Sequence, residues 1–92
     1  MADAEKTVLI QNERGLHARA AAQFVQLAAK FPTCEITLSK EGNTVNGKSV
    51  MGVLMLVAPK GTHVTIKATG DRGAEAVAAL SKLVDDKFNE DK

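Results

Sequence analysis

The spacing of apolar residues along this chain switches repeatedly between every second position and every third or fourth. Alternation at every second position is typical of half-buried strands, and the stretches predicted as strands are 6–10, 34–39, 44–46 and 62–68. Spacing at three and four is typical of helices that bury one face, and the stretches predicted as helices are 18–30, 50–58 and 74–89. Pro32 and Pro59 are expected to end the first two helices. The predicted order of elements is therefore βαββαβα.

The predicted strands are apolar on one side only. In the last of them, Val64 and Ile66 share one side, while His63 and Thr65 share the other. An antiparallel sheet can bury one face and leave the other to water, whereas a parallel sheet is covered on both. We therefore expect an α+β fold, an open-faced β-sandwich with a four-stranded antiparallel sheet and three helices on one face. The 92 residues suffice for a single domain, 1–92, and are too few for two independent cores.

Charge and aromatic content argue against nucleic-acid and membrane partners. Twelve Lys and Arg against eleven Asp and Glu leave a formal net charge of +1, with neither sign in a block. Proteins that bind nucleic acid or anionic membranes without specificity carry clusters of basic residues instead. A small RNA-binding α+β domain would also need aromatic side chains on its open sheet face. The chain has only three aromatic residues, all phenylalanines in or beside predicted helices.

The single cysteine and the absence of long apolar stretches set further bounds. Cys34 permits neither an internal disulfide nor a multi-cysteine metal site. It lies on the apolar side of its strand, where we expect an inert buried thiol. The polar start is unlike a secretory signal, and the longest apolar run, 50–58, is about half of what a membrane span needs. We expect a cytoplasmic protein that uses no metal and no cofactor.

His17 lies just before the first turn of the predicted 18–30 helix, with Arg19 two positions later. A helix N-terminus offers free backbone N–H groups and the positive end of the helix dipole, and both favour an anion. The arginine fork suits phosphate oxygens, and a neutral imidazole is nucleophilic near pH 7. These residues can form, hold and release a phosphoryl group on a ring nitrogen, although a histidine that only caps the helix fits the same pattern. His63, on the polar side of its strand, is expected to be an ordinary exposed residue.

Two separated segments carry a resemblance to a known family. Residues 15–25 read GLHARAAAQFV, and residues 46–53 read NGKSVMGV. The first resembles the active-site segment of the HPr family, the histidine-containing phosphocarriers of the phosphoenolpyruvate-dependent phosphotransferase system. The second resembles the segment that holds the regulatory serine of that family, and the positions of His17 and Ser49 fit the family's spacing. The likeness covers nearly the whole chain and agrees with the predicted order of elements.

The resemblance implies a role for each residue of the first segment. His17 would receive the phosphoryl group on Nδ1 from phosphorylated enzyme I and pass it to A-type domains of the sugar-specific enzymes II. Arg19 would neutralise the transferring group, and the backbone N–H groups of Ala18 and Arg19 would cradle it, because phosphoryl transfer needs positioning and charge stabilisation. Such a protein is a monomer that serves sugar transport and forms a phosphohistidine intermediate without being a stand-alone catalyst. Ala20 departs from many family members, which carry proline there, and this departure affects the rigidity of the helix start.

Ser49 is predicted to cap the helix that begins at Val50. By the resemblance it would also be a regulatory phosphoserine, modified by HPr kinase/phosphorylase. A phosphate there would not melt the helix but would place charge beside an apolar docking surface. The positions that would contact partners, again by resemblance, are Val50, Met51 and Leu54. The positions that would face the core are Val53 and Leu56.

Two other functions remain open. A nitrogen-branch carrier of the same family would have a regulatory output instead of sugar uptake, and the acceptor domain that takes the phosphoryl group would distinguish it. A phosphorylation-controlled adapter would bind partners without carrying phosphate. His17 argues against the adapter, because an adapter needs no nucleophile at a helix start.

Overall fold

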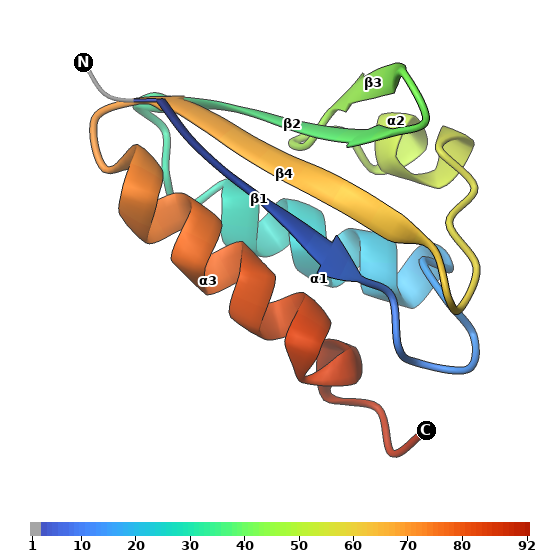
Figure 1. The fold of residues 1–92 in the computed structure, drawn as a ribbon. Helices are drawn as coiled ribbons and strands as arrows, with labels where there is room; N and C mark the ends of the chain where they lie inside the picture. Colours follow the sequence, from blue (N-terminus) through green and yellow to red (C-terminus); the bar gives the residue numbers. More distant parts are fainter. Residues whose placement is uncertain (1–2) are drawn as a thin grey trace.

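Four strands form one antiparallel sheet in the order β1-β4-β2-β3 (Figure 1). The structure, a computed structural model, describes residues 3–92. The strands are β1 (Asp3–Leu9), β2 (Cys34–Lys40), β3 (Asn43–Asn46) and β4 (His63–Gly70). The helices are α1 (Ala18–Ala28), α2 (Val50–Met55) and α3 (Gly73–Asp85), followed by a short turn, η1 (Lys87–Asn89). The predicted order of elements and the open-faced α+β sandwich are confirmed.

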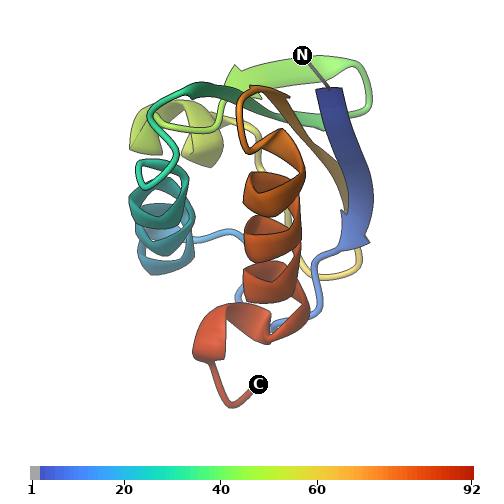
Figure 2. The ribbon, with the colours of Figure 1, turned by 90° about the vertical axis from the view of Figure 1, so that its left-hand side faces the viewer.

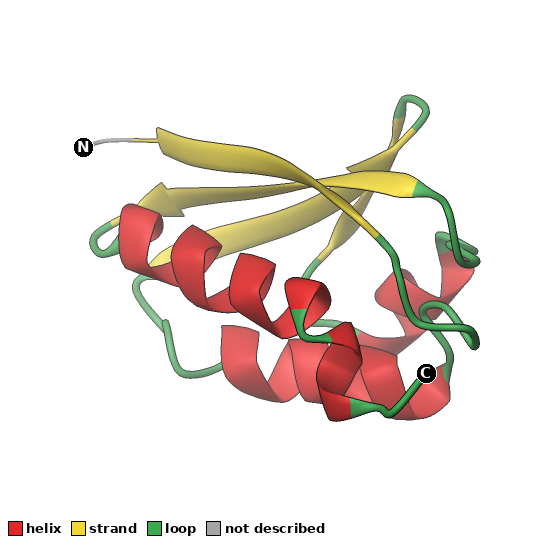
Figure 3. Ribbon diagram, turned by 60° about the horizontal axis from the view of Figure 1, so that its bottom comes forward, coloured by secondary structure: helices red, strands yellow, loops and turns green. Residues whose placement is uncertain are grey.

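The helices cover one face of the sheet, and α1 and α3 lie side by side beneath it (Figures 2 and 3). The strand register places Val8 opposite Val64 and Leu38 opposite Ile66, so that the apolar sides of three strands form one surface. The core lies between this surface and the helices, and its largest fully buried apolar side chains are Phe24, Phe88, Ile10, Leu38, Ile66 and Leu80. On the opposite face, the hydroxyl groups of Thr7 and Thr65 are hydrogen-bonded at 2.8 Å. Within residues 3–92, no helix is long and apolar enough to cross a membrane.

The first strand is longer than predicted and the first helix is shorter. β1 begins at Asp3 instead of residue 6, because backbone pairing with β4 extends through the polar residues as far as Asp3 opposite Thr69. Alternation of side chains cannot reveal such an extension, since it depends on the neighbouring strand. α1 ends at Ala28, before the predicted end at residue 30, and the chain then turns ahead of Pro32.

The predicted nine-residue helix 50–58 is also wrong in length, since α2 has six residues. Val57 adopts a left-handed backbone conformation with φ of 52°, which is rare for a β-branched residue. Lys40 Nζ donates a hydrogen bond of 2.5 Å to the Val57 carbonyl oxygen. The apolar run therefore ends in a turn, and Pro59 lies beyond the helix instead of ending it.

The last helix stops at Asp85, and the predicted continuation to about Asn89 is a turn instead. Lys87, Phe88 and Asn89 all have left-handed backbone conformations, with φ of 57°, 56° and 62°. Each such residue costs about 1–2 kcal/mol, and burial of the Phe88 side chain, which is 1% exposed, offsets part of that cost. The turn directs residues 89–92 toward the start of α1 (Figure 1).

Candidate functional site

His17 is the N-cap of α1. Its backbone is extended, with φ of −79° and ψ of −179°, and its carbonyl oxygen accepts the first hydrogen bond of the helix from the Ala21 N–H at 2.8 Å. The ring atom Nδ1 accepts a hydrogen bond of 3.3 Å from the Arg19 N–H. The first turn contains no acidic side chain, so no residue of α1 itself offsets the positive end of the helix dipole beside the ring.

Gly15 allows the chain to make the turn that precedes His17. Its φ is +64°, which favours glycine, and a Cβ atom there would lie 2.7 Å from the Ala58 carbonyl oxygen and 2.8 Å from Pro59 Cα. The same carbonyl oxygen of Ala58 accepts a hydrogen bond of 2.9 Å from the Leu16 N–H. The loop before α1 is thereby fixed against the segment that follows α2.

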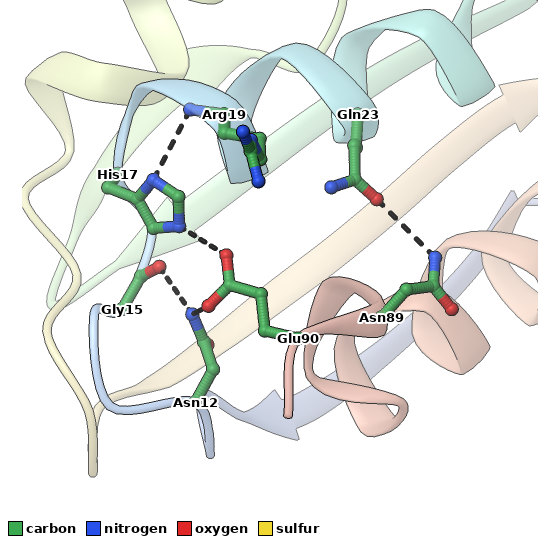
Figure 4. Close-up of polar contacts among 7 residues, drawn as sticks. All are labelled: Asn12, Gly15, His17, Arg19, Gln23, Asn89 and Glu90. Atoms are coloured by element: carbon green, nitrogen blue, oxygen red, sulfur yellow. Dashed lines mark hydrogen bonds and ion pairs between the residues drawn. The ribbon is translucent and has the colours of Figure 1, made fainter. Parts of the chain in front are cut away.

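The second ring nitrogen of His17 contacts the C-terminal segment. Nε2 lies against Glu90 Oε2, and the other carboxylate oxygen, Oε1, accepts a hydrogen bond of 3.0 Å from Asn12 Nδ2 (Figure 4). The same amide nitrogen donates to the Gly15 carbonyl oxygen at 2.8 Å. Asn12 is fully buried, and the side chains of His17 and Glu90 are each 16% exposed. The ring is therefore held at both nitrogens.

Partial burial raises the pKa of Glu90, but the hydrogen bonds from His17 and Asn12 and the charges of His17 and Arg14 outweigh it. The pKa of this carboxyl consequently lies below its ordinary value of 4.5. Glu90 is an ionised carboxylate at neutral pH.

A hollow of about 520 Å³ opens between the start of α1 and residues 88–92. Arg14, Arg19 and Lys92 line it together with three acidic residues, so the hollow itself has little net charge. The attraction for an anion near His17 therefore depends on the helix start and on the exposed Arg19 side chain.

Ser49 is the N-cap of α2, as predicted. Its backbone is extended, and its Oγ accepts a hydrogen bond of 3.1 Å from the Gly52 N–H. The predicted core residues Val53 and Leu56 are buried, while Val50 and Met51 are exposed. Exposed apolar side chains continue along this surface at Met55 and Val57.

The structure brings part of this surface close to His17. A shallow groove is lined by His17, Leu16 and Arg14 on one side and by Leu54 and Val57 on the other. Leu54 is half-buried, and Ser49 is not among the residues that line the groove. The histidine and the apolar surface of α2 therefore share one face.

The structure also shows the surroundings of Cys34, which is expected to be buried, of His63, which is expected to be exposed, and of Ala20. Cys34 is buried, and its thiol donates to the Asp71 carbonyl oxygen at 2.7 Å. His63 is exposed on β4, and Ala20 is buried in the first turn of α1. Over residues 3–92, no group of three or more His, Cys, Asp or Glu side chains is placed to hold a metal ion.

Sequence reasoning missed Asn12 and Glu90. Asn12 lies in a stretch expected to be a polar turn, and Glu90 follows a stretch expected to be helical. No periodicity links residues that are 73 or 78 positions apart. Only the tertiary fold, through the left-handed turn at Lys87–Asn89, brings Glu90 to the ring.

Comparisons with known proteins agree with the geometry. A family model described as the phosphorylation site of the HPr component of the phosphotransferase system matches residues 4–86. The phosphocarrier protein HPr of Xylella fastidiosa is 44% identical over 87 residues, which cover 95% of this chain and 97% of the relative. The crystal structure of HPr-C-His from Thermoanaerobacter tengcongensis has a TM-score of 0.91 at 44% identity and covers 97% of this chain and 99% of that chain.

A second solved structure bears on the oligomeric state. The crystal structure of an HPr dimer from Thermoanaerobacter tengcongensis has a TM-score of 0.75 at 45% identity and covers 95% of this chain and 99% of that chain. The monomeric state expected for this chain therefore stays a prediction. The family model, the sequence similarity over nearly the full length and the shared fold all agree. This chain therefore belongs to the HPr family of phosphocarrier proteins of the phosphotransferase system.

Proposed function

We propose that His17 accepts a phosphoryl group on Nδ1 from phosphorylated enzyme I and passes it to A-type domains of enzymes II. The observation that carries this proposal is the position of the ring at the start of α1, with Nδ1 directed toward the Arg19 N–H. The Nδ1 lone pair attacks phosphorus, and the bond from phosphorus to the donor breaks with its electron pair remaining on the donor. Transfer to the acceptor domain reverses these roles.

The start of α1 stabilises the transferring group in this proposal. The first N–H groups of a helix have no partner among the helix carbonyl oxygens, so that of Ala18 is available to phosphoryl oxygens. The Arg19 N–H becomes available when Nδ1 gives up its hydrogen bond to attack phosphorus. Arg19 is exposed, and its guanidinium group can turn toward the added charge. The step needs little beyond positioning and charge stabilisation.

We assign partner docking to the apolar surface of α2. Val50, Met51 and Leu54 are its contact residues in this proposal, and the groove that Leu54 shares with His17 supports it. Methionine side chains such as Met51 adapt to partners of different shape, which suits a carrier that must bind a donor and several acceptors.

Phosphorylation of Ser49 by an HPr kinase/phosphorylase would regulate this docking. The added group would bring a charge of about −1.5 to −2 next to Val50 and Met51. A charge at this position opposes the burial of apolar side chains against a partner. The helix itself would tolerate the phosphate, because the dipole favours negative charge at its start.

The test is intact-mass spectrometry after incubation with enzyme I, Mg²⁺ and phosphoenolpyruvate. We expect one acid-labile phosphoryl group in the unaltered chain and in His63→Ala, and none in His17→Ala. The His63 variant is the matched control, because it removes the other histidine, which is exposed on β4. If active enzyme I leaves the unaltered chain unmodified, the carrier function is wrong.

The identity of the acceptor decides between branches of the family. Phosphorylated protein is mixed in turn with a sugar-specific A-type domain and with a nitrogen-type domain. We expect rapid transfer to the sugar-specific domain. Transfer to the nitrogen-type domain alone would assign this chain to the regulatory branch.

A further inference from the structure

The contact between His17 Nε2 and Glu90 is part of a hydrogen-bond network that also includes Asn12 and Gly15 (Figure 4). Asn12 Nδ2 donates both to Glu90 Oε1, at 3.0 Å, and to the Gly15 carbonyl oxygen, at 2.8 Å. Because Asn12 is fully buried, its amide is a fixed support for the carboxylate. The carboxylate is therefore aimed at the ring from a defined direction.

The residues before and after Glu90 in the sequence are both anchored to the rest of the protein. Before it, Phe88 is buried in the core, and Asn89 Nδ2 donates to Gln23 Oε1 on α1 at 3.4 Å. After it, the Lys92 carbonyl oxygen accepts a hydrogen bond of 3.0 Å from the Glu13 N–H. Glu90 therefore lies within a docked segment.

The two contacts of the ring require the same tautomer. An ionised carboxylate can only accept hydrogen bonds, so Nε2 must be the donor to Glu90. At the other nitrogen, Nδ1 accepts from the Arg19 N–H and must carry a lone pair. A neutral His17 in this setting has its hydrogen on Nε2 and its lone pair on Nδ1.

We propose that Glu90 is a positioning residue that holds His17 in the Nε2–H tautomer, keeps the lone pair on Nδ1 for attack on phosphorus once the Arg19 N–H releases it, and stabilises the charge that the ring gains. This inference rests on the proposed function of His17. When the Nδ1–P bond forms and the bond from phosphorus to the donor breaks, the proton remains on Nε2 and the ring becomes cationic. The carboxylate lies at the nitrogen opposite the phosphoryl group, where it stabilises the cation while staying away from the phosphoryl oxygens.

The experiment follows the tautomer and the transfer rate in the same variants. The ¹⁵N chemical shifts of His17 are recorded at about pH 9, where imidazoles are neutral, and the rate of phosphoryl uptake from phosphorylated enzyme I is measured by rapid quench. The variants are Glu90→Ala, which removes acceptor and charge, and Glu90→Gln, which keeps an acceptor oxygen. Asp91→Ala is the matched control, since within residues 3–92 Asp91 has no hydrogen bond or ion pair with a side chain.

We expect Glu90→Ala to lower the Nε2–H fraction and to slow uptake about tenfold, because a hydrogen bond to a charged group is lost. Glu90→Gln keeps most of the tautomer preference and slows uptake by a smaller factor, about threefold. Asp91→Ala changes neither quantity. Backbone amide spectra of each variant show whether the fold is retained.

The outcomes separate this inference from the proposed function. If Glu90→Ala keeps the tautomer population and the uptake rate of a wild-type chain that is itself phosphorylated, the role of Glu90 is wrong and the carrier function stands. If Asp91→Ala slows uptake as much as Glu90→Ala, the effect is one of general charge, which also overturns the role of Glu90. A wild-type chain that takes up no phosphoryl group overturns the proposed function itself, whatever the ring spectra show.

Discussion

His17 is the N-cap of α1 and Ser49 is the N-cap of α2, and at both positions the side chain accepts a hydrogen bond from a backbone N–H of the first turn. Both residues have extended backbones, so the two helix starts are locally alike. Their surroundings differ, because His17 contacts Glu90, whereas Ser49 precedes the exposed apolar residues Val50 and Met51. Two similar caps therefore lie in different chemical surroundings. The carboxylate that distinguishes His17 comes from Glu90, 73 positions away in the chain.

The largest expected effect comes from His17→Asn, which separates capping from chemistry. Asparagine is among the best N-cap residues, so α1 should be retained, and the free energy of unfolding should fall only by the contribution of the contact with Glu90. Phosphoryl uptake should be lost completely, because the amide offers no nucleophilic ring nitrogen. Mass spectrometry and thermal unfolding measure the two quantities, and His63→Asn serves as control. Residual acid-labile phosphate in His17→Asn would place the acceptor elsewhere.

The next effect concerns the charge at the start of α1. Arg19→Ala should slow uptake from phosphorylated enzyme I about 10- to 100-fold, because the charge-assisted hydrogen bonds to the phosphoryl oxygens are lost. Arg19→Lys should recover part of the rate, since it restores the charge without the planar fork. Both are read by rapid quench at fixed ionic strength. Equal rates for Arg19→Ala and the unaltered chain would remove Arg19 from the site.

At the other helix start, Ser49→Ala should cost about 1 kcal/mol of folding free energy, because the hydrogen bond to the Gly52 N–H is lost. Uptake at His17 should continue at nearly the normal rate. Ser49→Asp should keep the cap and slow uptake, since it places charge beside the docking surface. Denaturant unfolding and rapid quench check both variants. Loss of uptake in Ser49→Ala would mean that the two helix starts are not separate in function.

The smallest expected effect is the dependence of folding on acid pH. The pKa of Glu90 is lowered in the folded chain, by the contacts with His17 and Asn12. Its contribution to stability is therefore full above the unfolded value of 4.5 and is lost as the pH falls through the lower folded value. The stability difference between the unaltered chain and Glu90→Ala should therefore shrink as the pH falls from above 4.5 through the lower folded pKa. A stability difference that stays constant over this pH range would contradict a stabilising interaction between the ionised Glu90 carboxylate and His17.

The fold could be predicted because its signals are local. Alternation in residues 62–68 reports the one apolar face of β4, and Ser49 before an apolar run reports the start of α2. The end of α2 could not be predicted from local spacing. Val57 after the helix has a left-handed conformation, and its carbonyl oxygen accepts a hydrogen bond from Lys40, which lies 17 positions away in β2.

The candidate site divides in the same way. His17, Arg19 and the exposed residues of α2 lie in two short segments with recognisable patterns. Glu90 is 73 positions from His17 and lies beyond a left-handed turn, so the pairing depends on how the complete fold closes. Phe88 fits the apolar stripe of α3 in the sequence but is buried outside the helix. The left-handed turn that contains the buried Phe88 also brings Glu90 back to the ring.

Beyond the Phe88 anchor, residues 89–92 are held to the rest of the chain by a small set of polar contacts. Segments held in this way open by local fluctuation far more often than the whole domain unfolds. The Glu13 amide, which donates to the Lys92 carbonyl oxygen, should therefore exchange its hydrogen much faster than the amides of β4. The ring of His17 would thus alternate between a state in contact with Glu90 and a state without this contact, while the sheet stays folded.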